Sequence, residues 1–501
     1  MTSLNFKLAA QFARSLPRCR CCAGLPFLRV FVGWSPQGAA FSSLIVLFVL
    51  LLFYPTAAFA STDGALILER ANSNENIYSG GELVSNLRGN VVFRYEDMRI
   101  SSDEATWWRK AGRVDFRKKV KVERAGDVMT CDRMRFSRDR NILTAAGQFR
   151  YQDSAQVTFL SGSEAEYSID RKTFLLRGSP LLVRKDSTDT DTLFISGRIM
   201  TYDDSLKIAT VTDDVRITRG HLKATCKTAQ YFAETDMAYL RTSPEVFYEG
   251  HQVVGDTIDL HFGKEALKSA RVVGNSHGRY TEVASSSNDT SVTHIWSDSL
   301  LLTMSESDSG KGRLETMKAF GKVRGRYVEV SPVSKDTSIT NIWSDSLLLT
   351  MSSDTGDGRL ETMKAFGNVH GRYVEISFSS KDTSVTNIWS DSLLLTMSET
   401  GKLDSMQAFG RVLSRYFTAG DSTKANEVSG RTMTLKFNEA GKIETAFVLG
   451  NAKSIYYIEE SDGGGRNEAS GDQITVRFAL GRARLLHLKG SARGIYFPNI
   501  N

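Results

Sequence analysis

From about residue 83 onward, apolar and polar residues alternate at every second position. Met317, Ala319 and Val323 fall on one side of such a segment, whereas Lys318 and Arg324 fall on the other. A period of two places side chains alternately on the two faces of a β-strand, and the helical period of 3.6 is missing from this part of the sequence. The pattern predicts an all-β protein built from half-buried strands.

The alternating segments belong to repeated units. The decapeptide Ile295–Met304 returns almost unchanged at 342–351 and 388–397, and Arg313–Gly321 returns at 359–367. Three nearly identical units therefore cover about residues 295–416, which indicates recent duplication. Because stacked strand units bury one continuous apolar stripe, we expect an elongated, twisted jellyroll or solenoid-like stack with open ends. Ten units at ~10 Å each would give a length on the order of 100 Å.

Each unit carries apolar residues at alternate positions in its first half. One face of each strand must be buried, so we expect these residues to point into a shared interior. With the weaker copies on either side, they comprise Ile258, Leu260, Phe262, Leu300, Leu302, Met304, Leu347, Leu349, Met351, Leu393, Leu395, Met397, Met433, Leu435, Phe437, Ile474, Val476 and Phe478. Such an interior is compatible with a slot that accepts acyl chains or with a dry core that its own side chains fill.

A glycine lies near the centre of the second half of each unit. At intervals of 40 to 47 residues, the series is Gly274, Gly321, Gly367, Gly410, Gly450 and Gly490. These segments are long for single strands. Each glycine is therefore expected at a corner or bulge where the chain passes from one sheet to another.

The same pattern continues toward the N-terminus in more divergent form. Residues 61–82 are expected to be a lead-in, residues 83–254 divergent repeats, and residues 255–497 the clearer repeats. No change of composition and no Pro- or Ser-rich linker separates the last two segments. We therefore predict one continuous array rather than separate domains.

Residues 1–60 differ from the array and have the features of a secretory signal peptide. Five basic residues and no acidic residue accompany the apolar run Leu44–Phe53, and Ala58-Phe59-Ala60 follows just before Ser61. These features predict export to the periplasm with cleavage after Ala60. A retained membrane anchor is the alternative, because the basic region is unusually long.

Removing the leader changes the charge and the cysteine content. It leaves 58 basic and 57 acidic residues, a net charge of +1, so the basic balance that would favour a nucleic-acid partner disappears. Only Cys131 and Cys226 remain, and we expect them to be isolated buried thiols rather than a disulfide.

The sequence shows none of the motifs that carry catalysis or bind cofactors. Its seven histidines are scattered without the spacing of metal ligands, and Asp298, Asp345 and Asp391 recur in a way that is typical of turn residues. We therefore predict no catalytic residues, no metal, no cofactor and no enzymatic activity.

Trp296, Trp343 and Trp389 recur one unit apart and allow two interpretations. They could form an aromatic rail that binds a sugar or a lipid headgroup, or they could cap the core at a corner. Of the two, we favour capping.

Together these motifs resemble the OstA-like lipopolysaccharide-transport proteins. The resemblance rests on Gly-Asp-x-Ile-x-Leu-x-Phe followed by Gly-x-Leu and Ala-x-Gly-x-Val-x-Gly-x-Tyr, on Gly-Asn-Val-Val-Phe at Gly89–Phe93, and on Ser-Asp-Glu-Ala-Thr-Trp at Ser102–Trp107. It covers roughly Leu83 to Phe497. The chain departs from the family's bridge proteins in its greater length and its triplicated units.

The resemblance implies a periplasmic β-jellyroll whose interior shields the acyl chains of lipopolysaccharide and passes them toward the outer membrane. It also implies docking, through terminal edge strands, to other jellyroll transport proteins of the inner-membrane ABC transporter complex and of the outer-membrane translocon. The rival hypothesis is a secreted structural or adhesive β-solenoid with a solid core, which would bind partners through its loops.

Overall fold

The computed structural model describes residues 64–185, 192–263, 267–283, 290–305, 313–331, 334–352, 359–378, 381–418, 425–439, 441–458, 464–479 and 482–498. All of them belong to the unit Asp63–Asn501. The predicted leader and its cleavage site lie outside these residues. Throughout the described part the secondary structure is β, which confirms the predicted fold class, and no described helix is long and apolar enough to cross a membrane.

The strands form one sheet in which every neighbouring pair is antiparallel. In chain order they are β1 (Leu66–Arg70), β2 (Ser73–Ser79), β3 (Glu82–Tyr95), β4 (Met98–Trp108), β5 (Arg113–Arg124), β6 (Asp127–Ser137), β7 (Ile142–Gln152), β8 (Thr158–Ser168), β9 (Thr173–Arg177), β10 (Leu181–Arg184), β11 (Leu193–Ser196), β12 (Ile199–Asp203), β13 (Ile208–Arg219), β14 (Leu222–Phe232), β15 (Met237–Arg241), β16 (Glu245–Tyr248), β17 (His251–Val254), β18 (Thr257–Phe262), β19 (Leu267–Val283), β20 (Thr290–Ser305), β21 (Arg313–Val330), β22 (Thr337–Met351), β23 (Leu360–Ile376), β24 (Thr383–Met397), β25 (Leu403–Thr418), β26 (Asn426–Phe437), β27 (Ile443–Ile458), β28 (Gly465–Ala479), β29 (Arg482–Lys489) and β30 (Arg493–Pro498).

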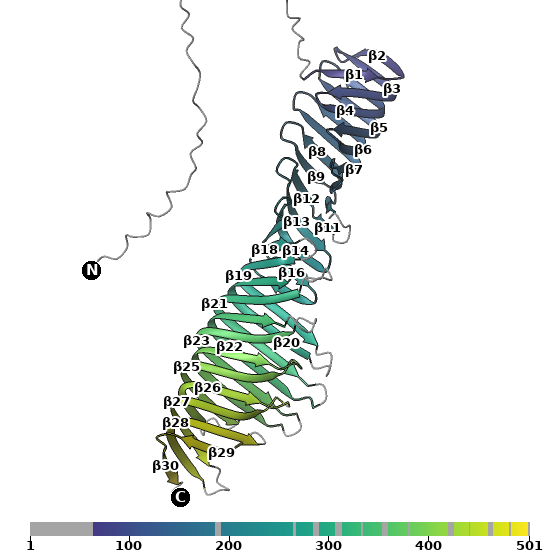
Figure 1. Cartoon of the computed structure of the whole chain (residues 1–501). Helices are drawn as coiled ribbons and strands as arrows, with labels where there is room; N and C mark the ends of the chain where they lie inside the picture. Colours follow the sequence, from purple (N-terminus) through teal and green to yellow (C-terminus); the bar gives the residue numbers. More distant parts are fainter. Residues whose placement is uncertain are drawn as a thin grey trace, which may run out of the picture. The chain divides into compact units, whose positions relative to one another are not determined.

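The strands stack as rungs that follow the chain from β1 to β30 (Figure 1). Most rungs are single long strands that pair with the strands before and after them, as β19 to β28 do. Elsewhere two short strands share one rung, as β29 and β30 do on β28. The stack has about 24 rungs and, at ~4.8 Å per rung, extends on the order of 110 Å, as the repeats predict.

Every long strand bends near its middle, and the bend divides the sheet into two facing leaflets. On β21 the pairing with β22 runs to Phe320, skips two residues, and resumes at Val323. The skipped residues, Gly321 and Lys322, have φ angles of 75° and 46°. We call the half that contains Arg313–Phe320 leaflet A and the half that contains Val323–Val330 leaflet B, and extend these names to the paired halves of the other rungs.

The corner requires glycine for two reasons. Gly321 and Gly367 adopt φ angles of 75° and 76°, which L side chains avoid. A Cβ on Gly321 would also collide with the carboxylate of Asp298, and one on Gly367 with that of Asp345. The predicted corners lie at the glycine series, but the chain bends there within one sheet instead of passing from one sheet to another. The recurring aspartates lie at these corners, opposite the glycines.

The two cysteines of the array agree with the sequence prediction. Cys131 and Cys226 are free and buried. Burial raises the pKa of the Cys131 thiol to about 12 and that of the Cys226 thiol to about 11. Both thiols are therefore protonated at neutral pH, and they act as small apolar core residues.

Candidate functional site: the trough between the leaflets

All eighteen residues predicted to face the interior lie on leaflet A. Seventeen of them are at most 7% exposed, and Phe478 is half-buried against the same core. Leaflet B supplies the opposing wall through residues such as Ile295, Tyr327 and Tyr373. We call the space between the two walls the trough.

In the N-terminal half, aromatic side chains fill the trough. Phe174 is 1% exposed, and its ring centre lies 4.5 Å from that of Tyr167, 4.7 Å from Tyr151 and 6.4 Å from Tyr202. A second cluster joins Phe93 to Phe116 and Trp107 at 5.5 and 5.4 Å. Large rings in edge and tilted contact close this half as a packed core.

Through the nearly identical units, glycines on leaflet B allow the leaflets to approach closely. A Cβ on Gly325 would lie 3.1 Å from Cδ2 of Leu347, and one on Gly371 would lie 3.0 Å from Cδ2 of Leu393. These leucines, from leaflet A, therefore pack against the bare backbone of leaflet B. Leu349 and Leu395 beside them are 0% exposed, so this part of the trough is closed as well.

Tyrosines of leaflet B close the side of the trough that faces away from the corners. The hydroxyl of Tyr327 donates a 3.0 Å hydrogen bond to the carbonyl of Gly401, and that of Tyr373 donates one of 2.6 Å to Gly441. Both acceptors lie in leaflet A loops, 74 and 68 residues further along the chain. We call these two bonds the tyrosine latches.

An ion pair supports the second latch. Lys442, next to Gly441, lies 3.8 Å from the carboxylate of Glu375, which is two residues after Tyr373. Burial raises the pKa of Glu375, and the lysine opposes that shift. The pKa of Tyr373 is raised well above its usual value, chiefly by burial, so its hydroxyl keeps the proton that it donates.

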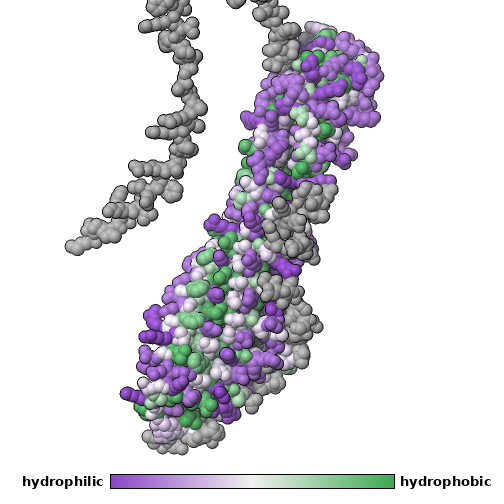
Figure 2. All heavy atoms as spheres, viewed as in Figure 1, coloured by the Kyte–Doolittle hydropathy of each residue, from purple (hydrophilic) through white to green (hydrophobic). Residues whose placement is uncertain are grey.

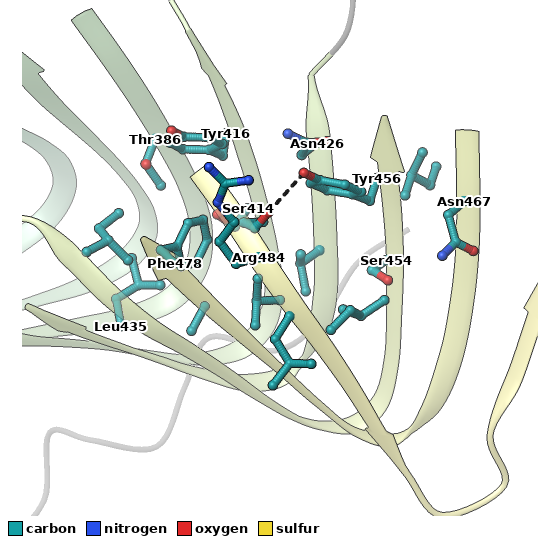
Figure 3. Close-up of a pocket in the computed structure, with 18 of the residues that line it drawn as sticks. Thr386, Ser414, Tyr416, Asn426, Leu435, Ser454, Tyr456, Asn467, Phe478 and Arg484 are labelled. Carbon is teal, nitrogen blue, oxygen red and sulfur yellow. Dashed lines mark hydrogen bonds between the residues drawn. The ribbon is translucent and has the colours of Figure 1, made fainter. Parts of the chain in front are cut away.

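At the C-terminal end the trough contains a cavity of about 250 Å³ (Figure 3). Its apolar wall comes from leaflet A and includes Met433, Leu435, Val476 and Phe478 of the predicted set, joined by Ile443, Ala446 and Leu486. Its other wall, from leaflet B, carries hydroxyl and amide groups on Thr386, Ser414, Tyr416, Asn426, Ser454, Tyr456 and Asn467. The hydroxyl of Tyr456 donates a 3.2 Å hydrogen bond to the carbonyl of Ala483, which lies on leaflet A.

The cavity opens where the leaflet B residues change. Along one inward row, the glycines at 325 and 371 give way to Ser414 and Ser454, which keep leaflet A farther from the backbone. On the alternate strands of the same row, Ile388 gives way to Val428 and then to Ala469, so methyl and methylene groups that fill the trough are lost. Wider spacing and smaller side chains together leave unfilled space.

Both ends of the stack present strands with one unpaired edge. All seven residues of β2 are exposed, as are all six of β30. On β30, Ile495, Tyr496 and Phe497 are 59, 50 and 41% exposed. An open edge with apolar side chains is a template for strand addition.

Other predicted features lie away from the trough. Trp296, Trp343 and Trp389 are half-buried on the outer face of leaflet B, so they do not cap the core. Within the described ranges, no group of three or more His, Cys, Asp and Glu side chains is arranged to hold a metal ion.

Comparison with known proteins gives a weak likeness in structure and none in sequence. No protein-family model matches the sequence, and no curated protein matches it. Among solved structures, the chain is similar to LptH from Pseudomonas aeruginosa, described as the LptA homologous periplasmic component of a lipopolysaccharide transport device. The match has 14% identity, covers 29% of this chain and 82% of LptH, and has a TM-score of 0.16. A superposition at this level carries no functional argument.

Proposed function

We propose that the protein is a periplasmic lipid carrier that shields acyl chains in its trough and does not act as an enzyme. The supporting observation is the C-terminal cavity, which lies between the leaflets and has a leaflet A wall that is apolar except for Arg484. Apolar surface that is left unfilled by the protein favours an apolar ligand. Because the sequence resembles OstA-like proteins, we propose that the bound lipid is lipopolysaccharide and that the protein passes it toward the outer membrane.

The eighteen interior residues of leaflet A form the proposed acyl path. Met433, Leu435, Val476 and Phe478 make the first contacts, because they line the cavity. Chains move beyond the cavity only when the leaflets separate, since the closed units leave no space between Leu393 and the backbone of Gly371. On this proposal the tyrosine latches open and close the side of the trough.

We further propose that the exposed end strands dock onto other jellyroll transport proteins, toward the inner-membrane transporter at one end and the outer-membrane translocon at the other. Pairing along β30 would cover Ile495 and Phe497 and satisfy the free backbone groups of that edge. An Ile495→Pro variant removes one backbone N–H from β30 and is expected to weaken such docking without changing the trough.

The packed core through most of the stack supports a second candidate, a structural or adhesive solenoid. On that view the C-terminal cavity is a packing defect and the loops bind the partners. The two functions differ in whether the purified protein carries lipid.

Native mass spectrometry of the exported chain distinguishes them. The carrier is expected to release acyl lipid on denaturation, and Ala446→Phe, which fills the cavity, is expected to remove most of it. Phe409→Ala, an exposed apolar change on the outer face of leaflet A, serves as the control and should leave the lipid content unchanged. Protein without lipid, or lipid that is unaffected by Ala446→Phe, would favour the solid structural role.

A further inference from the structure

The outer face of leaflet B carries a row of stacked rings. Register places His277, Trp296, Arg324, Trp343, His370 and Trp389 side by side on successive strands from β19 to β24. His277 stacks on Trp296 with ring centres 5.0 Å apart, and His370 stacks on Trp343 and Trp389 at 4.9 Å each. The guanidinium of Arg324 lies 5.3 Å from the ring centre of Trp296. We call this series the ring row.

The ring row presents edges to solvent. Its planes are nearly parallel, with interplanar angles of 6° for His277 on Trp296 and 1° for His370 on Trp389. His370 lies between Trp343 and Trp389, and Trp296 lies between His277 and the guanidinium of Arg324, so these two rings can offer a ligand only their edges. The row therefore offers a ligand mainly ring edges rather than open stacking surfaces.

A row of cations runs beside it, nearer the rim of leaflet B. Register places Arg279, Arg326, Arg372 and Arg415 on alternate strands, all of them exposed. The strands between carry His294, Asn341 and Asn387 at the same level. We call this series the arginine row.

The arginine row lacks acidic partners over most of its length. Of the four arginines in this row, only Arg415 forms an ion pair with a described residue, at 2.9 Å to Glu427, where the row ends. Arg279, Arg326 and Arg372 form none, and Arg324 in the ring row adds a fifth positive charge. Among the described residues, the face thus presents regularly spaced cations of which only Arg415 is paired with a carboxylate.

We propose that this face binds a linear acidic polysaccharide laid along the stack. Arginines two rungs apart repeat every ~9.6 Å, a spacing that suits a polymer with one anionic group per disaccharide. Guanidinium groups bind carboxylate, sulfate or phosphate with two parallel hydrogen bonds. The asparagine amides between them both donate to and accept from sugar hydroxyls, and the ring-row edges add N–H donors. This inference is independent of the lipid carrier function, since it concerns the face that points away from the trough.

Two other polyanions fit the face less well. Single-stranded nucleic acid gains much of its affinity by stacking bases on aromatic faces, and here both faces of Trp296 and His370 and one face each of Trp343 and Trp389 are covered. An anionic bilayer is bound best when apolar side chains enter it, whereas Trp296, Trp343 and Trp389 are half-buried within the sheet. A hydroxyl-rich, regularly charged chain uses every group that the face offers.

The test measures binding of the full exported chain to chondroitin sulfate of defined length, with neutral dextran, oligo-dT and phosphatidylglycerol vesicles as comparison ligands. The Arg326→Gln/Arg372→Gln double variant removes two cations from the row. Lys318→Gln/Lys364→Gln removes the same charge from the outer face of leaflet A and is the matched control. Arg326→Lys/Arg372→Lys keeps the charge and loses the two-bond geometry.

The arginine-to-glutamine variant is expected to bind chondroitin sulfate roughly 100-fold more weakly, about tenfold for each lost charged contact, with unchanged thermal stability. The lysine variant of the row is expected to recover part of the loss, and the leaflet A control should change affinity less than twofold. Equal losses in both glutamine variants would overturn the proposal, as would tighter binding of oligo-dT or vesicles at the same face. No binding of chondroitin sulfate by the unmodified chain would also overturn it.

Discussion

The N-terminal half and the C-terminal end of the stack are built from the same bent rungs, but their interiors are filled differently. In the N-terminal half, Phe93, Phe116 and Phe174 occupy the trough with rings that are at most 1% exposed. At the C-terminal end Ser414 and Ser454 stand where the closed units have glycine, Val428 stands where they have isoleucine, and about 250 Å³ stays unfilled. The backbone therefore supports a solid core or a cavity alike, and side-chain size on leaflet B decides between them.

The outer surfaces of the two halves differ as well. On the face shown in Figure 2, hydrophobic residues are more frequent over the C-terminal half than over the N-terminal half. Beside the corners, Phe320, Phe366 and Phe409 are 48, 47 and 40% exposed. The two halves thus offer different surfaces to partners as well as different interiors.

The largest expected difference is in the free energy of unfolding, when one aromatic ring is added to the closed units and one to the C-terminal cavity. Ala365 is 0% exposed in the closed units, so Ala365→Phe is expected to destabilise the fold by ~3 kcal/mol through overpacking. Ala446 lines the cavity, so Ala446→Phe should cost less than ~1 kcal/mol, because the ring enters existing space. Urea unfolding of both variants measures the contrast. Equal destabilisation would mean that the C-terminal space is not available to a ligand.

A smaller effect is expected from opening a tyrosine latch. Tyr373→Phe leaves the carbonyl of Gly441 without its donor and should cost ~1–2 kcal/mol. Amide hydrogen exchange should accelerate at Gly441 and Lys442 and remain unchanged in the N-terminal half. Tyr239→Phe is the control, since that hydroxyl meets only the sulfur of Met237 at 3.8 Å. Unchanged exchange at Gly441 would show that the latch does not hold the leaflets together.

The smallest effect concerns pH and the ring row. The pKa values of His277, His294 and His370 are lowered, first by burial and then, among other contacts, by Arg279, Arg326 and Arg372. The unfolded chain therefore takes up protons more readily than the folded one. The stability that these residues contribute is complete above the ordinary histidine pKa, about 6.5, and falls as the pH drops through that value.

Melting temperatures recorded between pH 8 and pH 5 test this expectation. Unmodified protein should lose stability across that interval, and His277→Gln/His294→Gln/His370→Gln should lose less. The N-terminal half has no member of the ring row, so hydrogen exchange there should respond less than in β19 to β24. An identical pH profile in the variant would show that these histidines do not couple folding to pH.

The sequence predicts the repeating strands, the corners and the inward residues of leaflet A, because period-two alternation and glycine spacing are local signals. It misplaces the three tryptophans of the ring row for a specific physical reason. Trp296 has the same parity as Leu300 and Leu302, but the bulge between Trp296 and Ser299 shifts the pairing, so the indole points outward while the leucines point inward. A single irregularity in register thus reverses which face a residue occupies.

The tyrosine latches and the cavity could not be predicted from the sequence. Each latch joins residues about seventy positions apart, and no local pattern indicates that pairing. The cavity depends on a few small differences within otherwise similar units, chiefly Ser414, Ser454 and Val428. Their effect becomes visible only when the two leaflets face each other.

Photo-crosslinking in cells tests the carrier function most directly. A photoreactive residue at Phe478, in the cavity, is expected to capture acyl lipid strongly. Residues at Leu302 and Leu395, deeper in the proposed path, should capture it more weakly and only while lipid is being exported, and one at the outward Lys318 should capture none. Capture at Phe478 that is no greater than at Lys318, or equal labelling at all four positions, would contradict the carrier function.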